Sequence, residues 1–453
     1  SGRMSNEAIK FIDLFAGLGG FHLALSHLGC KCVFASELRE DLQKLYKENF
    51  PGVRIEGDLT KIAPDSIPSH DIICGGFPCQ PFSQAGKRQG FNDEKNRGNL
   101  FDYICEIIAF HKPKYIFLEN VSNLKGHDEG RTWEVIYQRL HDELKYDIKE
   151  KILSPHQFGI PQHRKRIYIV GIREDLGGLG NFDFPEPTNS PCDIASIIDE
   201  ADTDITKLKL ETRQQLTLWQ EFIDNVISSG ESIPSFPIWA MEFGATYEYK
   251  FNAPAYQKVE DLNGKRGNLG QIISGKSLKA CLKQLPIYAQ TSTSKEFPQW
   301  KKRYIEQNRN FYNRHKLWLD KWLCKVKDFE NSHLKMEWNC GNASPIIEDK
   351  IVQFRASGIR VKMPTYAPAL NLVGTQIPIF PWITLPESVI KDGEPRQGRY
   401  MSLKEAAALQ GMQELNLHIK SPVSLSLTRA SEALGNAVNV KVVESIAQNL
   451  LEV

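Results

Sequence analysis

Apolar runs of four or five residues alternate with helical patterns through the first 175 residues of the chain. The runs are continuous and rich in β-branched and aromatic residues, which is typical of strands buried on both faces of a parallel sheet. The expected strands lie at residues 11–15, 32–36, 71–74, 114–118 and 166–170. With a helix expected at about 21–28, this alternation predicts an α/β domain with a parallel sheet.

The regular alternation stops at about residue 183, and helical patterns return only at residues 403–411 and at about 431–451. At roughly 100–200 residues per domain, the length suggests two or three domains. We therefore expect an α/β domain that is interrupted by a large insertion and completed by the end of the chain. The expected boundaries are 8–180 for the first part, 181–397 for the insertion, and 398–453 for the returning segment.

The composition is typical of a soluble globular protein, with 453 residues, 41% of them hydrophobic and 25% charged. It excludes a disordered, collagen-like or coiled-coil chain. The formal charge of +1, from 56 Lys and Arg against 55 Asp and Glu, would by itself argue against nucleic acid as a partner. That charge is an average, however, because residues 183–231 hold 11 acidic and 3 basic side chains, whereas residues 295–327 are rich in basic and aromatic ones.

The sequence also indicates the cellular compartment. No apolar run of about 18 residues is present, so we expect no membrane span, and the first residues lack the apolar core of a secretion signal. The nine cysteines are an odd number without a C-x-x-C pattern, which favours free thiols in a reducing compartment and no bound metal. These features predict a cytoplasmic protein.

A glycine-rich turn at residues 15–21, Phe-Ala-Gly-Leu-Gly-Gly-Phe, follows the first expected strand and opens a helix. Its spacing differs from the dinucleotide and P-loop patterns, so phosphate binding is not favoured. Glu37 ends the second strand, where a carboxylate can accept from ribose hydroxyls, and Asp58 can accept from an adenine amino group. These residues predict an adenosine ligand without pyrophosphate, such as S-adenosylmethionine; the alternative is a turn that only allows tight strand–helix packing.

Cys79 follows the apolar strand at 71–74 and lies between Pro78 and Pro81, which restrict the backbone around it. This places its thiol at a carboxyl end of the sheet, where open α/β sheets bind ligands. As a thiolate, Cys79 can act as a nucleophile. The other eight cysteines are interpreted as inert.

Six motifs follow one another along the chain: the glycine-rich motif 11–21, Gly-Phe-Pro-Cys-Gln at 76–80, Glu-Asn-Val at 119–121, a two-arginine motif at 158–167, the segment 399–411, and Gly-Asn-Ala-Val at 435–438. Together they fall within residues 10–175 and 398–450, about half of the chain. In this order they resemble the motifs of the DNA (cytosine-5) methyltransferase family, of the bacterial restriction–modification type.

The resemblance implies a Rossmann-like, S-adenosylmethionine-dependent methyltransferase sheet with an inserted target-recognition domain. It also implies the residues that line the cofactor site: Phe15, Gly17, Leu18, Gly19, Glu37, Asp58, Leu59, Pro78, Leu100 and Asn436. Two positions depart from the family pattern. Leu38 stands where relatives place a tryptophan against adenine, and Ala369-Leu370 stands where many relatives carry Thr-Leu.

The catalytic residues that the resemblance implies are Cys79, Glu119, Arg164 and Arg166. Cytosine must leave the duplex to reach a pocket, and the thiolate of Cys79 then adds to C6 so that C5 can take up a methyl group. Glu119 is the candidate for N3 of the base, and the two arginines for the base oxygen and a phosphate. The alternative for Glu119 and Arg166 is a structural ion pair, and no residue identifies itself as the acceptor of the C5 proton.

Candidate DNA contacts lie in a polar, glycine-containing loop and in the insertion. They are Gln80, Ser83, Lys87, Arg88 and Arg97 in or beside the loop, and Arg355, Arg360 and Gln376 in a segment that resembles the family's recognition core. The alternative for the loop is a plain solvated connection. In the basic stretch at 295–327, Trp318 and Trp322 lie four residues apart, so that stretch either contacts phosphates or contributes one buried stripe.

We therefore expect a monomeric bacterial enzyme that methylates C5 of a cytosine in a short, specific sequence of double-stranded DNA. By resemblance its functional counterpart is a restriction endonuclease whose sites the methylation protects. Two alternatives remain at this point: a cytosine-5 methyltransferase acting on tRNA, and a catalytically silent DNA-binding protein.

Overall fold

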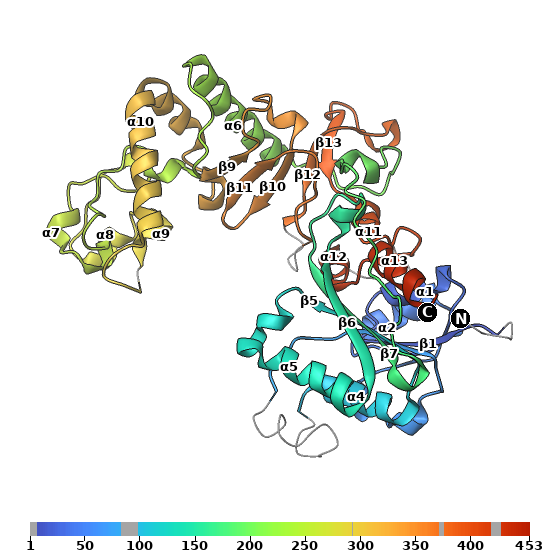
Figure 1. Cartoon of the computed structure of the whole chain (residues 1–453). Coiled ribbons are helices and arrows are strands. Elements are labelled where there is room, and N and C mark those ends of the chain that lie inside the picture. Colours follow the sequence, from blue (N-terminus) through green and yellow to red (C-terminus); the bar gives the residue numbers. More distant parts are fainter. Residues whose placement is uncertain (1–6, 83–97, 292, 371–375, 418–426) are drawn as a thin grey trace. The chain divides into compact units, whose positions relative to one another are not determined.

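The computed structural model describes residues 7–82, 98–291, 293–370, 376–417 and 427–453, which form two compact units (Figure 1). The first unit consists of Ser1–Ile198, Thr365–Gly374 and Ser402–Val453, and the second of Asp199–Pro364 and Thr375–Met401. The second unit thus interrupts the first, and a short segment at 365–374 returns to the first unit within the expected insertion.

A seven-stranded sheet forms the centre of the first unit, in the order β3-β2-β1-β4-β5-β7-β6. Neighbouring strands are parallel from β3 to β5, whereas β7 is antiparallel to both β5 and β6. The strands are β1 Lys10–Leu14, β2 Lys31–Ser36, β3 Ile55–Glu56, β4 Ile72–Gly76, β5 Tyr115–Val121, β6 Tyr146–Leu153 and β7 Arg166–Arg173. The predicted α/β class is confirmed, and each of the five expected strands is present. The prediction of a parallel sheet is wrong for the strand expected at 166–170, because β7 is antiparallel to its neighbours and the sheet is mixed.

Helices pack over the sheet and bury the apolar side chains of its central strands. Ile12, Ile73, Ile116 and Leu118 are fully buried in one cluster together with Ile104 of a neighbouring helix. The helices of this unit are α1 Gly20–His27, α2 Glu40–Asn49, α4 Leu100–His111, α5 Arg131–Tyr137, α11 Leu403–Leu409, α12 Leu427–Asn436 and α13 Val440–Leu450. α4 begins with a capping box. The Asn99 side chain accepts a hydrogen bond from a backbone N–H of the first turn, and the Asp102 side chain accepts one from the backbone N–H of Asn99.

The single helical pattern expected at about 431–451 is in fact two helices. The reason is Asn439, whose side chain accepts a hydrogen bond from the Val442 N–H at 3.1 Å and so starts a new helix. α13 packs against α1, which places the end of the chain beside the glycine-rich turn.

The second unit has its own six-stranded sheet, in the order β13-β12-β10-β11-β9-β8. Its strands are β8 Ile238–Trp239, β9 Lys335–Asn339, β10 Ile351–Arg355, β11 Gly358–Lys362, β12 Ile379–Thr384 and β13 Gln397–Tyr400. Two long helices, α6 Leu210–Ser228 and α10 Gln299–Val326, pack against each other. Trp322 of α10 is 1% exposed and its ring lies 4.9 Å from that of Trp219, so this tryptophan belongs to the core.

A small lobe with a separate core completes the second unit. It contains three short helices, α7 Val259–Leu262, α8 Leu278–Leu282 and α9 Ile287–Gln290, seen in yellow-green beside α10 in Figure 1. Tyr247, Leu262, Ile273 and Cys281 are among its fully buried residues. Within the described part of the chain, no helix is both long enough and apolar enough to cross a membrane.

Candidate active site

The glycine-rich turn joins β1 to α1 in a left-handed backbone conformation that favours glycine. Phe15, Gly17 and Gly19 have φ values of 53°, 52° and 90°. Neighbouring side chains also leave no room for a Cβ atom at two of the glycines. A Cβ on Gly19 would lie 2.4 Å from the Phe50 ring, and one on Gly20 would lie 2.5 Å from Val438. The glycines therefore allow both the turn and its close approach to α2 and to the C-terminal segment.

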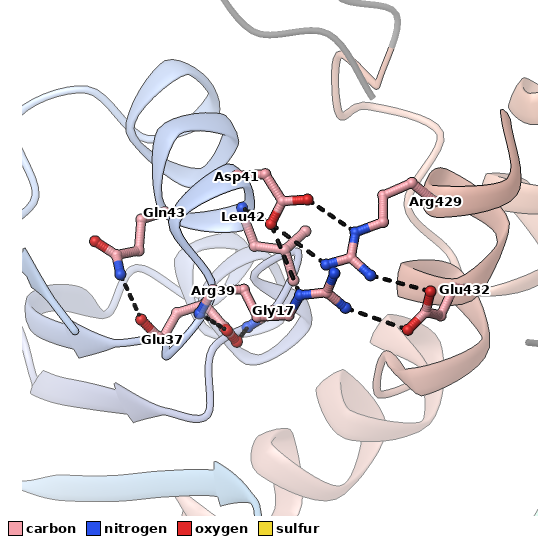
Figure 2. A network of polar contacts seen from close by, with 8 residues as sticks. All are labelled: Gly17, Glu37, Arg39, Asp41, Leu42, Gln43, Arg429 and Glu432. Carbon is pink, nitrogen blue, oxygen red and sulfur yellow. Dashed lines mark hydrogen bonds and ion pairs between the residues drawn. The ribbon is translucent and has the colours of Figure 1, made fainter. Parts of the chain in front are cut away.

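Glu37 follows β2, and backbone groups hold its carboxylate in place. One oxygen accepts from the Gly17 N–H at 2.9 Å and the other from the Arg39 N–H at 2.8 Å (Figure 2). The side chain of Gln43 donates to the Glu37 carbonyl at 2.8 Å, which fixes the backbone as well. Burial raises the pKa of Glu37, while the bond from Gly17 lowers it. Each carboxylate oxygen keeps acceptor capacity for a further donor.

A cavity of about 190 Å³ lies against this carboxylate. One wall comes from the turn and from the segment that begins α2, and the other from α12 and the residues after it. The lining residues are Phe15, Ala16, Gly17, Gly20, Phe21, Glu37, Arg39, Leu42, Gly76, Glu432, Ala433, Asn436, Ala437 and Val438. Four predicted cofactor residues, Phe15, Gly17, Glu37 and Asn436, are among them.

Ion pairs connect the two walls of the cavity, as Figure 2 shows. Arg39 contacts Glu432 at 3.2 Å, and Arg429 contacts both Asp41 at 2.8 Å and Glu432 at 3.0 Å. Sequence reasoning missed these four residues. Arg39 and Glu432 are 393 positions apart and Asp41 and Arg429 are 388 positions apart, so no local pattern indicates that they meet.

The six remaining predicted cofactor residues do not line this cavity, and their role stays a prediction. Leu18 and Leu59 are buried, Gly19 is in the turn, and Pro78 is exposed. Leu100 begins α4. Asp58 accepts from the N–H of Thr60 at 2.9 Å and from its hydroxyl at 2.7 Å, and these bonds lower the pKa of Asp58.

The segment that carries Cys79 follows β4 and is anchored on both sides. The Asn120 side chain of β5 donates to the Phe77 carbonyl at 2.9 Å. On the other side, Asn99 donates to the Gln80 carbonyl at 2.9 Å. The side-chain oxygen of Gln80, a predicted DNA contact, accepts from the Leu100 N–H at 3.0 Å. Cys79 itself is half-buried, and burial raises the pKa of its thiol.

Glu119 is buried on β5, opposite Gly76 in the register between β4 and β5. A Cβ on Gly76 would lie 3.6 Å from a Glu119 oxygen, so nothing larger than glycine separates this carboxyl group from the end of β4. Arg166 begins β7 and its Nε lies 3.9 Å from a Glu119 oxygen. Burial raises the pKa of Glu119 to about 7, although Arg166 and Arg164 oppose the shift.

Arg164 precedes β7 and is held from two sides. Its N–H donates to the Ser154 hydroxyl and its guanidinium to the Ala437 carbonyl, each at 2.9 Å. Burial and the neighbouring charge of Arg166 lower the pKa of Arg164 to about 10. Its buried Nε has no hydrogen-bond partner among the described residues, so one donor remains for another molecule.

The remaining predicted DNA contacts are placed as follows. Ser83, Lys87, Arg88 and Arg97 lie outside the described residues. In the second unit, Arg355 donates to the Gly358 carbonyl at 3.1 Å and lies 3.3 Å from Glu337. Arg360 is opposite Gln353 between β10 and β11. The Gln353 side chain donates to the Gln376 carbonyl at 2.8 Å. Their contact with bases stays a prediction.

Residues 9–452 match the model of the family described as C-5 cytosine-specific DNA methylase. The chain belongs to this family. The predicted resemblance is thereby confirmed. Among the residues that the structure describes, no group of three or more His, Cys, Asp and Glu side chains is placed to hold a metal ion.

Part of this chain is similar to several type II methyltransferases, and three of these relatives are M.DsaV, M.HhaI and M.HpaII. Type II methyltransferase M.DsaV of Dactylococcopsis salina is 45% identical over 197 residues, which are 44% of this chain and 55% of that relative. M.HhaI of Haemophilus parahaemolyticus is 48% identical over 40% of this chain and 53% of that relative. M.HpaII of Haemophilus parainfluenzae is 47% identical over 47% and 59%. The matched part thus spans somewhat over half the length of these relatives.

Proposed function

We propose that this protein transfers a methyl group from S-adenosylmethionine to C5 of a cytosine flipped out of a short, specific sequence in duplex DNA. The observation that carries the proposal is the grouping of Cys79, Glu119 and Arg166 at neighbouring ends of β4, β5 and β7. Asn120 ties the cysteine segment to the strand that holds the carboxyl group. Family membership and the names of the type II relatives support DNA as the substrate.

Cys79 is the nucleophile in this proposal. A cytosine inside the duplex is out of reach, so the base must first leave the stack, at a cost of a few kcal/mol. The thiolate forms a bond to C6, and the electron pair of the C5–C6 double bond moves through the ring toward N3. Glu119, with a pKa of about 7, is in part protonated near neutral pH and can donate its proton to N3. Arg166 lies close enough to stabilise the carboxylate that is left.

The residues around the cavity fit the adenosine part of the cofactor. Both oxygens of Glu37 are oriented by backbone N–H groups and can each accept one more hydrogen bond, which suits the two hydroxyls of a ribose. Phe15 and Val438 add apolar surface for a base. When bound, S-adenosylmethionine supplies an electrophilic methyl group on a sulfonium.

Loss of the C5 proton completes the reaction in this proposal. After C5 has taken up the methyl group, a base or an ordered water removes that proton. The electron pair of the C–H bond reforms the C5–C6 double bond, and the bond from C6 to the Cys79 sulfur breaks to release the thiolate. N3 returns its proton to Glu119, so the base leaves neutral and the acid is restored. The buried, unpartnered Nε of Arg164 can meanwhile donate to an oxygen of the substrate.

We propose further that the second unit recognises the DNA sequence and that the enzyme acts as a monomer in the bacterial cytoplasm. A cognate restriction endonuclease is the functional counterpart, in keeping with the names of the type II relatives. Arg355, Arg360 and Gln376 are the candidate base contacts, since Arg pairs with guanine and Gln with adenine. The loop residues Ser83, Lys87, Arg88 and Arg97 are candidate phosphate contacts.

Bisulfite sequencing of plasmid DNA from cells that express the protein tests the proposal. In cells with the wild-type protein, one cytosine in every copy of a single short sequence is expected to be methylated and so to resist deamination by bisulfite. In cells with Cys79→Ala, no cytosine is expected to resist it. Cys324→Ala removes an exposed thiol far along the chain and serves as the matched control that keeps full protection. Protection by Cys79→Ala would exclude the covalent step, and incorporation of labelled methyl groups into tRNA instead of DNA would exclude the substrate.

A further inference from the structure

Residues 262–295, which we call the basic lobe segment, hold six basic side chains and no acidic one. The six are Lys265, Arg266, Lys276, Lys279, Lys283 and Lys295. All but Lys265 are exposed. A run of 34 residues without a carboxylate is unusual in a chain whose acidic and basic residues are almost equal in number, so this surface carries a concentrated positive charge.

The described part of the basic lobe segment, residues 262–291 and 293–295, has a defined conformation. Asn263 donates to the Gly275 carbonyl at 2.9 Å and accepts from the Gly275 N–H at 2.9 Å, which closes a loop. Gln284, just after α8, joins that loop to the helix through two bonds with Ser274, of 3.0 and 2.9 Å. The core of the small lobe lies beneath. The cations are therefore presented by a folded support, which lowers the entropy lost when they bind a partner.

The positive charge of this segment is not neutralised within the protein. Among the described residues, none of the six side chains takes part in an ion pair; Arg266 donates to the Gly270 carbonyl. The neighbouring basic stretch at 295–327, which shares Lys295 with this segment, is partly neutralised. Four of the eight Lys and Arg side chains on α10 are paired with acidic residues: Lys302 with Glu296, Arg309 with Glu242, Arg314 with Glu231 and Lys325 with Glu221. Cations without an ion pair to a described residue thus lie in the basic lobe segment and also on α10, where Arg303, Lys316 and Lys321 are exposed; in the basic lobe segment, however, none of the cations is neutralised by a described residue.

We infer that the basic lobe segment binds the sugar–phosphate backbone of duplex DNA without reading the bases. This inference rests on the proposed function, because the DNA that the segment would bind is the same duplex that carries the cytosine to be methylated. Duplex DNA presents one negative charge per ~1.7 Å, which suits several cations spread over one surface. Lys279 and Lys283 are four residues apart on one face of α8 and its C-cap.

The side-chain types in this segment agree with backbone contact. Five of the six cations are lysines, which act as flexible point charges and lack the planar groups with which Arg, Asn and Gln pair with base edges. The amides of Asn263 and Gln284 are already used to hold the loop and helix together. The segment therefore adds affinity for any sequence, and discrimination between sequences arises elsewhere.

The test compares two variants of the full-length protein. The first, Lys276→Gln/Lys279→Gln/Lys283→Gln, removes three unpaired exposed cations. The matched control, Lys302→Gln/Lys325→Gln, removes cations that Glu296 and Glu221 already neutralise. Equilibrium binding is measured between 50 and 200 mM NaCl on two duplexes of equal length, one with and one without the methylated sequence. Thermal unfolding checks that both variants are folded.

The triple variant is expected to bind both duplexes more weakly by the same factor. Its slope of log affinity against log salt should be smaller than that of wild type by about 2.7, at about 0.9 for each phosphate contact. The control should keep the wild-type slope. An unchanged slope, or a loss confined to the target duplex, would overturn the inference. Failure of the wild type to bind any duplex would instead overturn the proposed function.

Discussion

The side-chain amide of Asn120 donates a hydrogen bond to the main-chain carbonyl of Phe77 at 2.9 Å. This bond joins the strand that carries Glu119 to the segment that carries Cys79. Asn120 directly follows Glu119, and Phe77 lies two residues before Cys79. The positions of the proposed acid and the proposed nucleophile therefore depend on the same buried contact.

We expect Asn120→Ala to lower the rate of methyl transfer more than the affinity for DNA. The substitution leaves the Phe77 carbonyl without its partner, which costs about 1–3 kcal/mol, and it frees the cysteine segment to move. Steady-state kinetics should show a fall in kcat of at least ten-fold, with KM for DNA within a few-fold of wild type. A variant with normal kcat and lowered thermal stability would show that the bond is only structural.

Glu119 should make the stability of the protein depend on pH in a way that Glu119→Gln abolishes. Burial raises the pKa of Glu119 from 4.5 to about 7, so between these values the folded chain keeps a proton that the unfolded chain has lost. Unfolding then releases that proton, and the free energy of unfolding falls as pH rises from about 4.5 to 7. Over this window wild type should lose on the order of 3 kcal/mol relative to Glu119→Gln. Parallel curves of Tm against pH for the two proteins would contradict this.

Alkylation of Cys79 by iodoacetamide should remain slow at neutral pH in the absence of DNA. Burial raises the pKa of this thiol above its ordinary value, and only the thiolate reacts. We expect the rate of modification to keep rising as pH is raised beyond about 9, with peptide mass spectrometry to identify the site and Cys79→Ala as the control. A plateau below pH 8 would show that the free protein already stabilises the thiolate.

The ion pairs between α2 and α12 should govern how often α12 opens. Arg429→Gln removes contacts to both Asp41 and Glu432, so the amides of α12 should exchange hydrogen about five-fold faster, equivalent to about 1 kcal/mol of local stability. In the double variant Asp41→Asn/Arg429→Gln, the two effects should not add.

The exposed pair Lys44–Glu40 is the matched control for this network, because it joins residues within α2 and no second element. Lys44→Gln should leave the exchange of α12 amides unchanged. Equal acceleration by Lys44→Gln and Arg429→Gln would show that loss of any cation has this effect, and that the pairs across the cavity have none of their own.

Gly20→Ala should destabilise the first unit by about 1–3 kcal/mol, the usual cost of an added methyl group in a packed site. The new Cβ would lie 2.5 Å from Val438 Cγ2 and 2.9 Å from the Val438 carbonyl oxygen, so α1 and the C-terminal segment must move apart. Gly126→Ala is the control, since a Cβ there meets no atom within 4 Å. A Tm lowered equally in both variants would point to glycine-specific backbone effects instead.

The strands of the first sheet were predictable where both faces are buried. β1, β4 and β5 are continuous apolar runs, which single-strand patterns identify. β6 was missed, because at the edge of the sheet its polar and apolar residues are mixed, as in Tyr146-Asp-Ile-Lys-Glu-Lys. The second sheet was missed for a further reason: β8 has only two residues, and it pairs with β9 almost 100 residues later.

The candidate site was predictable through its motifs, and its geometry was not. Cys79 and Glu119 each stand in a recognisable motif, but their neighbourhood follows from the pairing of β4 with β5, which no local pattern specifies. The spacing of Trp318 and Trp322 left two interpretations open. Trp322 proved to be core because Trp219 covers it, and Trp219 lies in the acidic stretch at 183–231, about 100 positions earlier in the chain.

The two walls of the cavity are made at very different times during protein synthesis. Arg39 and Glu432, which meet across it, are separated by 393 positions. At ribosomal rates of roughly 5–20 residues per second, the second wall follows the first by on the order of 20–80 s. A nascent or prematurely terminated chain therefore presents Cys79 beside half a cavity, and only copies whose translation has run through α12 acquire the complete one.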